Sequence, residues 1–192
     1  MLFIGLNPSF SEKGYRTFLS GTLYEDILND LEREYLFKEF DRNKDKGKAI
    51  KKFIAIEKMS MEKYSYYVKF SELAKSIDLD WEHIDLFFIR DTKQKSLEEQ
   101  YKKENISLWK QLKLSYNLIE ASQPKMIVVA NAFASKIFQK DHNLKWNNNL
   151  GTYLYNESIP IFLTSMLTGQ RSLDTGSYER LKWHLKYTKN KI

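Results

Sequence analysis

The sequence predicts an α/β fold: a three-layer α/β/α sandwich around a central, mainly parallel sheet of four strands. The first observation is a set of four short apolar runs, which are typical of strands buried on both faces. The second is that longer polar segments of helical period separate the runs, and helical crossovers are the usual connections between parallel strands. The four runs are residues 2–4, 84–89, 126–130 and 160–163.

Size and composition favour one globular domain over residues 1–192. The chain has 42% hydrophobic residues, three prolines and seven glycines, so it can bury a core. It has no cysteine and three scattered histidines, which argues against disulfides, thiolate chemistry and a zinc site. No apolar stretch approaches the ~20 residues of a membrane span. We therefore expect a cytoplasmic monomer with no metal, no cofactor and no membrane partner.

The formal net charge of +6 favours a polyanionic partner. Much of the excess lies in two places, residues 42–52 and the C-terminal helix. The basic side chains of residues 42–52 could follow a DNA backbone, or the basic residues in both places could simply form solvated lysine faces. The basic residues concerned are Arg42, Lys44, Lys46, Lys48, Lys51 and Lys52, and near the C-terminus Lys182, Lys186, Lys189 and Lys191.

The first part of the chain reads as strand, loop and helices. Residues 2–4 are the first strand, and residues 9–21 are expected to form a loop. Thr22 and Glu25 match a capping box, so a helix should begin there with Leu23, Ile27 and Leu31 facing inward. Residues 48–77 have a helical pattern. The segment 33–80 is therefore expected to be a helical, basic insert.

The second part alternates strands and helices. Residues 84–89 should be a strand, with residues 90–92 as its exit loop. Ser96 and Glu99 match another capping box, which predicts one amphipathic helix through Ile119. After the strand 126–130, Asn131 should turn the chain into a short helix, and a hairpin is expected near Tyr153. The strand 160–163, its exit loop 164–176 and a final helix complete the fold.

The most informative local motif is Gly5-Leu6-Asn7-Pro8-Ser9, which follows the first strand. Glycine lets a ligand approach the backbone, and proline disfavours helix at the residue before it. The motif thus puts the amide of Asn7 just beyond the carboxyl end of a strand, where parallel sheets bind their ligands. The alternative is an Asn that only caps its own turn.

The order of these segments resembles the uracil-DNA glycosylase superfamily, and in particular its mismatch-specific and single-strand-selective branches. FIGLNPSFS resembles their first motif, with Ser9 in place of a glycine. IDLFFIRDTKQ is similar to the strand that ends at the base-reading residue. LKLSYNLIEASQPKMIVVANAFAS and FLTSMLTGQRSLDTGSYERLKWHL resemble the following helix and strand, and then the last strand with its DNA-inserting loop and helix.

The resemblance implies a monofunctional DNA repair enzyme that hydrolyses the N-glycosidic bond of a deaminated or damaged base, in single- or double-stranded DNA. The residue implied as catalytic is Asn7, whose amide would orient the attacking water. Base-binding roles are implied for Gly5, Leu6, Pro8, Phe18 and Asp91. Phe18 is the expected stacking aromatic, with Tyr15 and Phe10 as alternatives.

Asp91 departs from the family pattern, which has an Asn at this position. An ionised carboxylate only accepts hydrogen bonds, so it would suit an N–H or amino group and repel carbonyl oxygens. We therefore expect a base preference that differs from uracil. Asp91 could instead pair with Arg90 or cap the next helix.

The loop after the last strand also departs from the family pattern, because it contains no histidine. Gly169 permits close approach of the backbone, Arg171 can pair with a phosphate, and Gln170 or Leu167 could occupy the space of the extruded base. The implied DNA-binding residues are Ser9, Leu167, Thr168, Gly169, Gln170 and Arg171.

Two other functions are compatible with the sequence. One is a non-catalytic relative that binds lesions or nucleic-acid ends, and the other is an enzyme that processes a free nucleoside or nucleotide. The chain has neither a phosphate-binding Gly-x-x-x-x-Gly-Lys motif nor a Gly-x-Ser-x-Gly elbow, which argues against a P-loop enzyme and a serine hydrolase.

Overall fold

A computed structural model covers the chain and describes residues 1–8, 12–23, 25, 46–89 and 94–192. These residues belong to two compact units. The first consists of Met1–Pro8 and Lys69–Ile192, and the second is Ser9–Val68. In the described part of the chain, no helix combines the length and the apolar character that crossing a membrane requires.

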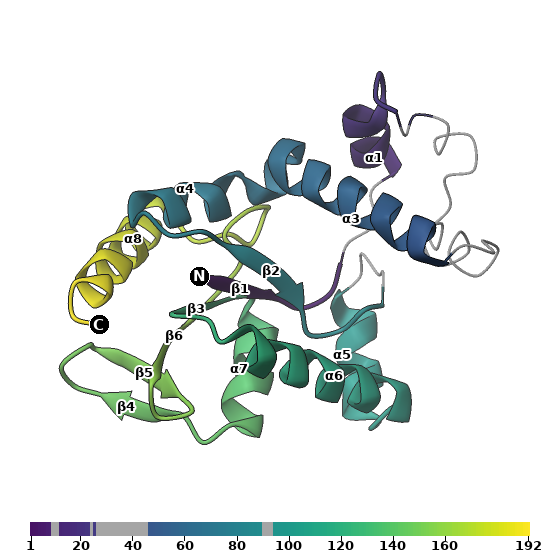
Figure 1. The fold of residues 1–192 in the computed structure, drawn as a ribbon. Coiled ribbons are helices and arrows are strands. Elements are labelled where there is room, and N and C mark those ends of the chain that lie inside the picture. The colour runs from purple at the N-terminus through teal and green to yellow at the C-terminus, as the bar shows by residue number, and fades with distance from the viewer. Residues whose placement is uncertain (9–11, 24, 26–45, 90–93) are drawn as a thin grey trace. The chain divides into compact units, whose positions relative to one another are not determined.

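The first unit contains one mixed, mostly parallel sheet with the strand order β2-β1-β3-β6-β5-β4 (Figure 1). Four strands run parallel to one another: β1 (Leu2–Gly5), β2 (Glu82–Asp85), β3 (Ile127–Ala130) and β6 (Ile159–Thr164). The hairpin expected near Tyr153 forms β4 (Lys145–Asn147) and β5 (Thr152–Tyr155), and β5 pairs antiparallel with β6. The expected four-stranded sheet is therefore the parallel part of a larger sheet of six strands.

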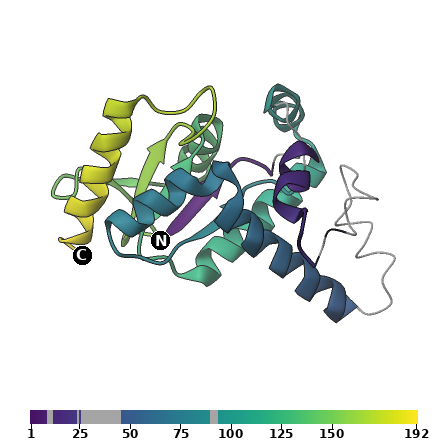
Figure 2. The ribbon, with the colours of Figure 1, turned by 90° about the horizontal axis from the view of Figure 1, so that it is seen from above.

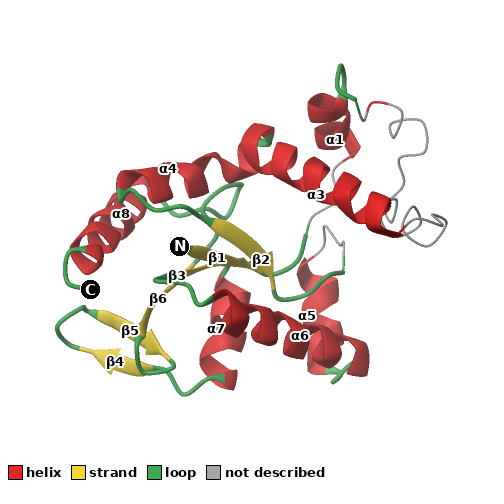
Figure 3. Ribbon diagram, viewed as in Figure 1, coloured by secondary structure: helices red, strands yellow, loops and turns green. Residues whose placement is uncertain are grey.

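Helices cover both faces of this sheet (Figure 3). On one face lie α4 (Val68–Ser76) and α8 (Thr175–Lys189), which run side by side in the view from above (Figure 2). On the other face lie α5 (Gln94–Lys102), α6 (Ile106–Ser122) and α7 (Ala132–Asp141). Side chains alternate between the faces along β1, so that Ile4 lies in the core beneath α6 whereas the ring of Phe3 packs 4.8 Å from that of Phe70 in α4.

The helix expected to begin at Ser96 is in fact two helices. The chain leaves α5 through Glu104, which has a positive φ of 54°, and Asn105 then caps α6 by accepting a hydrogen bond from the Ser107 backbone N–H at 2.9 Å. Ser96 lies inside α5 rather than at its N-terminus. Asparagine is one of the strongest N-cap residues, so the signal at Asn105 outweighs the Ser96–Glu99 spacing.

The second strand lies earlier in the chain than the apolar run 84–89 suggests, because it ends at Asp85. The backbone N–H groups of Leu86 and Phe87 still donate to the carbonyls of Gly5 and Leu6, at 3.2 and 2.9 Å. The backbone N–H of Phe88 instead donates to Gln111 Oε1 at 2.7 Å, which ends the pairing. Leu86 and Phe87 are buried in the core all the same. The buried apolar residues thus continue for at least two positions beyond the end of β2.

The described part of the second unit is helical. It contains α1 (Glu12–Leu19), α3 (Lys46–Lys63) and the short 3-10 helix η2 (Ser65–Tyr67). Together with α4, the last two confirm the helical pattern predicted for residues 48–77. The loop predicted for residues 9–21 is wrong, because α1 lies there.

The expected capping box at Thr22 is not formed. The hydroxyl of Thr22 donates to the Leu19 carbonyl at 2.6 Å, while the Glu25 carboxylate accepts from the Gly21 backbone N–H at 3.0 Å. Leu23 is 95% exposed, so its expected inward position is also wrong. The expected inward residues Ile27 and Leu31 lie outside the described residues.

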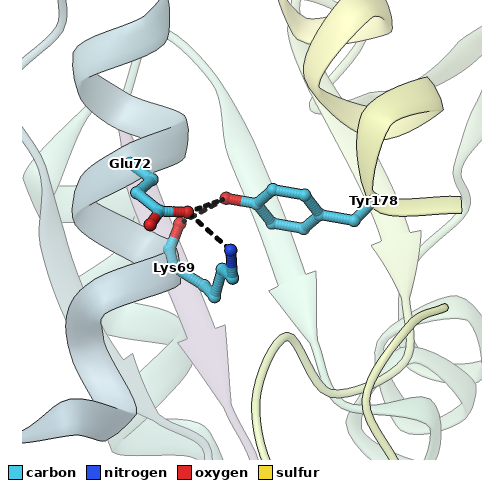
Figure 4. Close-up of polar contacts among 3 residues, drawn as sticks. All are labelled: Lys69, Glu72 and Tyr178. Carbon is cyan, nitrogen blue, oxygen red and sulfur yellow. Dashed lines mark hydrogen bonds and ion pairs between the residues drawn. The ribbon is translucent and has the colours of Figure 1, made fainter. Parts of the chain in front are cut away.

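A buried tyrosine joins the two helices on one face of the sheet (Figure 4). The hydroxyl of Tyr178 in α8 donates to the carbonyl oxygen of Lys69 at 3.2 Å and to the Glu72 carboxylate at 3.1 Å, both in α4. The Lys69 ammonium lies 2.8 Å from the same carboxylate and 4.7 Å from the centre of the Tyr178 ring. The hydrogen bond from Lys69 lowers the pKa of Glu72, and burial raises the pKa of Tyr178.

We expect Tyr178→Phe to lower the free energy of unfolding by about 0.5–1.5 kcal/mol, because it removes a hydrogen bond between α8 and α4 and keeps the ring. Urea unfolding followed by circular dichroism measures this loss. Tyr153→Phe is the matched control, since no hydrogen bond joins its hydroxyl to the residues that the structure describes. Equal stability of both variants would contradict the proposed link.

Candidate functional site

The strand order identifies the edge of the sheet where a ligand would bind. From β1 the chain passes to β2 on one side, and it later returns to β3 on the other side of β1. In open α/β sheets, ligands bind beyond the carboxyl ends of the two strands at which the strand order reverses, here β1 and β3. The residues that follow β1 and β3 at this edge are Leu6, Asn7 and Pro8 on one strand and Asn131 on the other.

Asn7 is half-buried, and its amide has a defined orientation. The amide nitrogen donates to the carbonyl of Ile89 at 3.2 Å and, over a longer distance of 3.4 Å, to that of Pro8. Ile89 belongs to the segment that follows β2 and runs beside residues 5 and 6. The donor end of the amide is thus hydrogen-bonded to the scaffold, and its carbonyl oxygen is the end that can accept a hydrogen bond from a water molecule.

Gly5, the last residue of β1, lies against two ionisable side chains from β2. A Cβ atom built on Gly5 would be 2.1 Å from Asp85 Oδ1 and 2.9 Å from His83 Nε2. The two side chains approach each other to 3.8 Å, and their exposed fractions are 8% for His83 and 13% for Asp85. At this separation the imidazole and the carboxylate lie beyond hydrogen-bond distance of each other, so any interaction between them is electrostatic; both can carry charge, which the Asn7 amide cannot.

Asn131, at the end of β3, has a structural role. Its side-chain oxygen accepts hydrogen bonds from the backbone N–H groups of Phe133 and Ala134, at 2.8 and 3.1 Å, and so caps α7. Its nitrogen donates to Gln94 Oε1 at 3.4 Å. Nearby, the Ser135 hydroxyl donates to the Thr164 carbonyl at 3.0 Å and ties α7 to the end of β6. At the switch point, therefore, the residues that follow β3 stabilise the local structure, whereas the residues that follow β1 include the candidate functional side chain, Asn7.

The loop that follows β6 forms a closed turn. Met166 pairs with Ser172, and the Leu173 backbone N–H donates to the Met166 carbonyl at 2.9 Å. Gly169, at the tip, has a φ of +87°, a conformation that other residues adopt only with strain. Gln170 and Arg171 are exposed next to it.

Two of the expected DNA-binding side chains in this loop are largely enclosed. Leu167 is only 4% exposed, and the Thr168 hydroxyl is buried without a hydrogen-bond partner among the described residues. Of the two residues considered for insertion into the base stack, Gln170 is therefore the one on the surface. Leu6, expected near the base, also packs in the core, so its side chain is not on the surface.

The remaining expected site residues lie either outside the described residues or in the second unit. Ser9, Phe10, Asp91 and its alternative partner Arg90 lie outside the described residues. Phe18 and Tyr15 belong to α1 in the second unit, and their side chains also lie outside the described residues. The same holds for Arg42 and Lys44, whereas Lys46 and Lys51 belong to α3.

Comparisons with protein-family models, with curated proteins and with solved structures gave no match. Among the residues that the structure describes, no group of three or more His, Asp or Glu side chains is placed to hold a metal ion.

His83 and Asp85 are candidate site residues that the sequence did not predict. A signal for both was present, because a His-x-Asp pair in a strand puts both side chains on one face. The apolar run 84–89 concealed it by shifting the expected strand toward the C-terminus. With the register as observed, Gly5 stands directly opposite Asp85, and Phe3 opposite His83.

Proposed function

We propose that this protein is a DNA N-glycosylase, which hydrolyses the bond between deoxyribose and a damaged base with a water molecule oriented by Asn7. One observation carries the proposal. An uncharged amide lies at the switch point of the sheet, with its nitrogen tied to the Ile89 carbonyl and its oxygen as the acceptor end. The resemblance of the first motif to that of the uracil-DNA glycosylase superfamily supports the same role.

The reaction suits an amide because it needs positioning more than proton abstraction. As the glycosidic bond breaks, the sugar becomes cationic and the departing base anionic, and a nearby water then attacks the sugar. Asn7 would hold that water by its carbonyl oxygen at any neutral pH, since an amide does not titrate. The Asp85 carboxylate at the same strand ends would, when ionised, favour the positive charge on the sugar.

Access to the base requires that the nucleotide leave the duplex or be presented on a single strand. In the proposal, Gln170 fills the space left in the stack and Arg171 pairs with a phosphate, since both are exposed beside Gly169. Asp91 would read the base, and as a carboxylate it would prefer a base edge that presents N–H or amino groups.

A panel of labelled oligonucleotides tests the proposal. The oligonucleotides carry uracil, hypoxanthine, xanthine or a mismatched thymine, each in single- and double-stranded form. We expect alkali-sensitive abasic sites in at least one of them, and more with hypoxanthine, whose N–H has one neighbouring carbonyl, than with uracil, whose N–H lies between two carbonyls. Binding to a lesion without any abasic product would favour a non-catalytic relative. If the protein neither binds the oligonucleotides nor yields abasic product, a role on DNA is contradicted and a nucleoside or nucleotide substrate is favoured.

A further inference from the structure

The C-terminal helix exposes aromatic rings together with positive charge, on residues that the candidate site does not use. Trp183 is 65% exposed, and its ring stacks on that of Tyr187 with centroids 5.5 Å apart and planes inclined by 13°. The Lys191 ammonium lies 5.7 Å from the centre of the Tyr187 ring. Trp183 and Tyr187 are four residues apart in α8 and so share one face of the helix, while Lys191 follows the end of α8 and reaches the Tyr187 ring. These three residues are here called the α8 stripe.

The α8 stripe is held in place by the neighbouring hairpin. The Tyr187 hydroxyl donates to the Asn149 carbonyl at 2.9 Å, and His184 Nε2 donates to the Leu150 carbonyl at 2.6 Å. These bonds join α8 to the turn between β4 and β5. The same hairpin carries a second exposed indole, Trp146, which is 55% exposed. The hydrogen bond of the Tyr187 hydroxyl therefore fixes the position of the ring on which Trp183 stacks.

The charges around the α8 stripe are mostly positive. A solvated helix face commonly carries lysines, but it rarely exposes a tryptophan stacked on a tyrosine, because burying such rings is favourable. The cations on and just after α8 are Arg180, Lys182, Lys186, Lys189 and Lys191, and the acid of α8, Glu179, lies one turn before Trp183 on the same face of the helix.

We propose that the α8 stripe binds single-stranded nucleic acid, with bases stacked on Trp183 and Tyr187 and the phosphates paired with the surrounding lysines. Proteins that bind single strands use exposed aromatic rings, on which unpaired bases stack, and positive charges, which pair with the phosphates. In a duplex the faces of the bases are already covered by their neighbours. An anionic membrane is less suited, since the Tyr187 hydroxyl is bound to the hairpin and cannot follow its ring into lipid. This site does not depend on the proposed glycosylase activity.

Fluorescence anisotropy with labelled, undamaged oligomers of about 20 nucleotides, oligo(dT) and oligo(rU), tests the proposal on the full chain. We expect Trp183→Ala to weaken binding about tenfold, from the loss of base stacking, and Trp183→Phe to weaken it less. Lys186→Gln should lower the slope of log affinity against log salt by about 0.7. The oligomer that binds more tightly identifies DNA or RNA as the ligand.

Two results would overturn this assignment. The first is no binding of either oligomer, and the second is equal affinity of the parent and Trp183→Ala. If neither oligomer binds, Trp183-dependent sedimentation with vesicles of phosphatidylglycerol and phosphatidylcholine would assign the α8 stripe to a membrane instead. Because Trp183 is largely exposed, its replacement should leave the fold intact, and circular dichroism of each variant checks this.

Discussion

Replacing Asn7 by alanine should lower the rate of base release by roughly 100-fold or more on the best oligonucleotide substrate. The reason is that alanine has no group to hold the attacking water, and a reactant misplaced by about 1 Å can cost two orders of magnitude. Single-turnover measurement of abasic sites, with enzyme in excess, gives the rate of the chemical step. The affinity for the same oligonucleotide, measured by anisotropy, should change far less.

Two further variants separate this effect from a general loss of structure. Asn7→Ala also removes the hydrogen bond to Ile89, which should cost about 0.5–1.5 kcal/mol of stability. Thr152→Val removes a comparable bond, from the Thr152 hydroxyl to the Ile161 carbonyl, in another part of the sheet and should retain full activity. Asn7→Asp keeps acceptor oxygens but loses the donor, so its activity should lie between those of the parent and Asn7→Ala. Full activity of Asn7→Ala would rule out the proposed role of the amide.

The parallel core of the fold could be predicted from the sequence because burial and strand pairing there coincide. The runs that became β1, β3 and β6 are apolar on both faces, and each is followed by a turn signal such as Asn131. The predicted elements were wrong where buried residues are not paired in a strand, or where a regular element lacks an apolar face. Leu86 and Phe87 are fully buried yet lie beyond β2, and α1 occupies a stretch of polar and aromatic residues without a long apolar face.

The candidate site could be predicted only in part, because its residues come from strands that meet through topology. The position of Asn7 followed from a local motif, Gly-x-Asn-Pro, at the end of a strand. The contact between Gly5 and Asp85 depends on the register of β1 against β2, which no local pattern specifies. Similarly, the sequence suggested Leu167 and Gln170 equally for insertion, and only the closed turn after β6 shows which of the two side chains is exposed.

Because Gly5 lies opposite Asp85 in the pairing of β1 with β2, even the addition of one methyl group at Gly5 should have a large effect on stability. We expect Gly5→Ala to lower the free energy of unfolding by about 1–3 kcal/mol, since its methyl group would overlap Asp85 Oδ1 and His83 Nε2. Relief requires the buried Asp85 carboxylate to leave its place beside β1, and Asp85 is short and enclosed. Denaturant unfolding of the variant measures the cost.

A glycine elsewhere in the first unit provides the control for this prediction. Gly176 lies in the first turn of α8, where an added Cβ would lie 3.3 Å from Asp174 Oδ1 and overlap its neighbour far less than at Gly5, so Gly176→Ala should cost much less stability than Gly5→Ala. The double variant Gly5→Ala with Asp85→Ala removes the nearest obstacle. Its loss of stability should therefore be smaller than the sum of the two single losses. Additive losses, or an unaffected Gly5→Ala, would show that the Asp85 carboxylate does not lie against the end of β1.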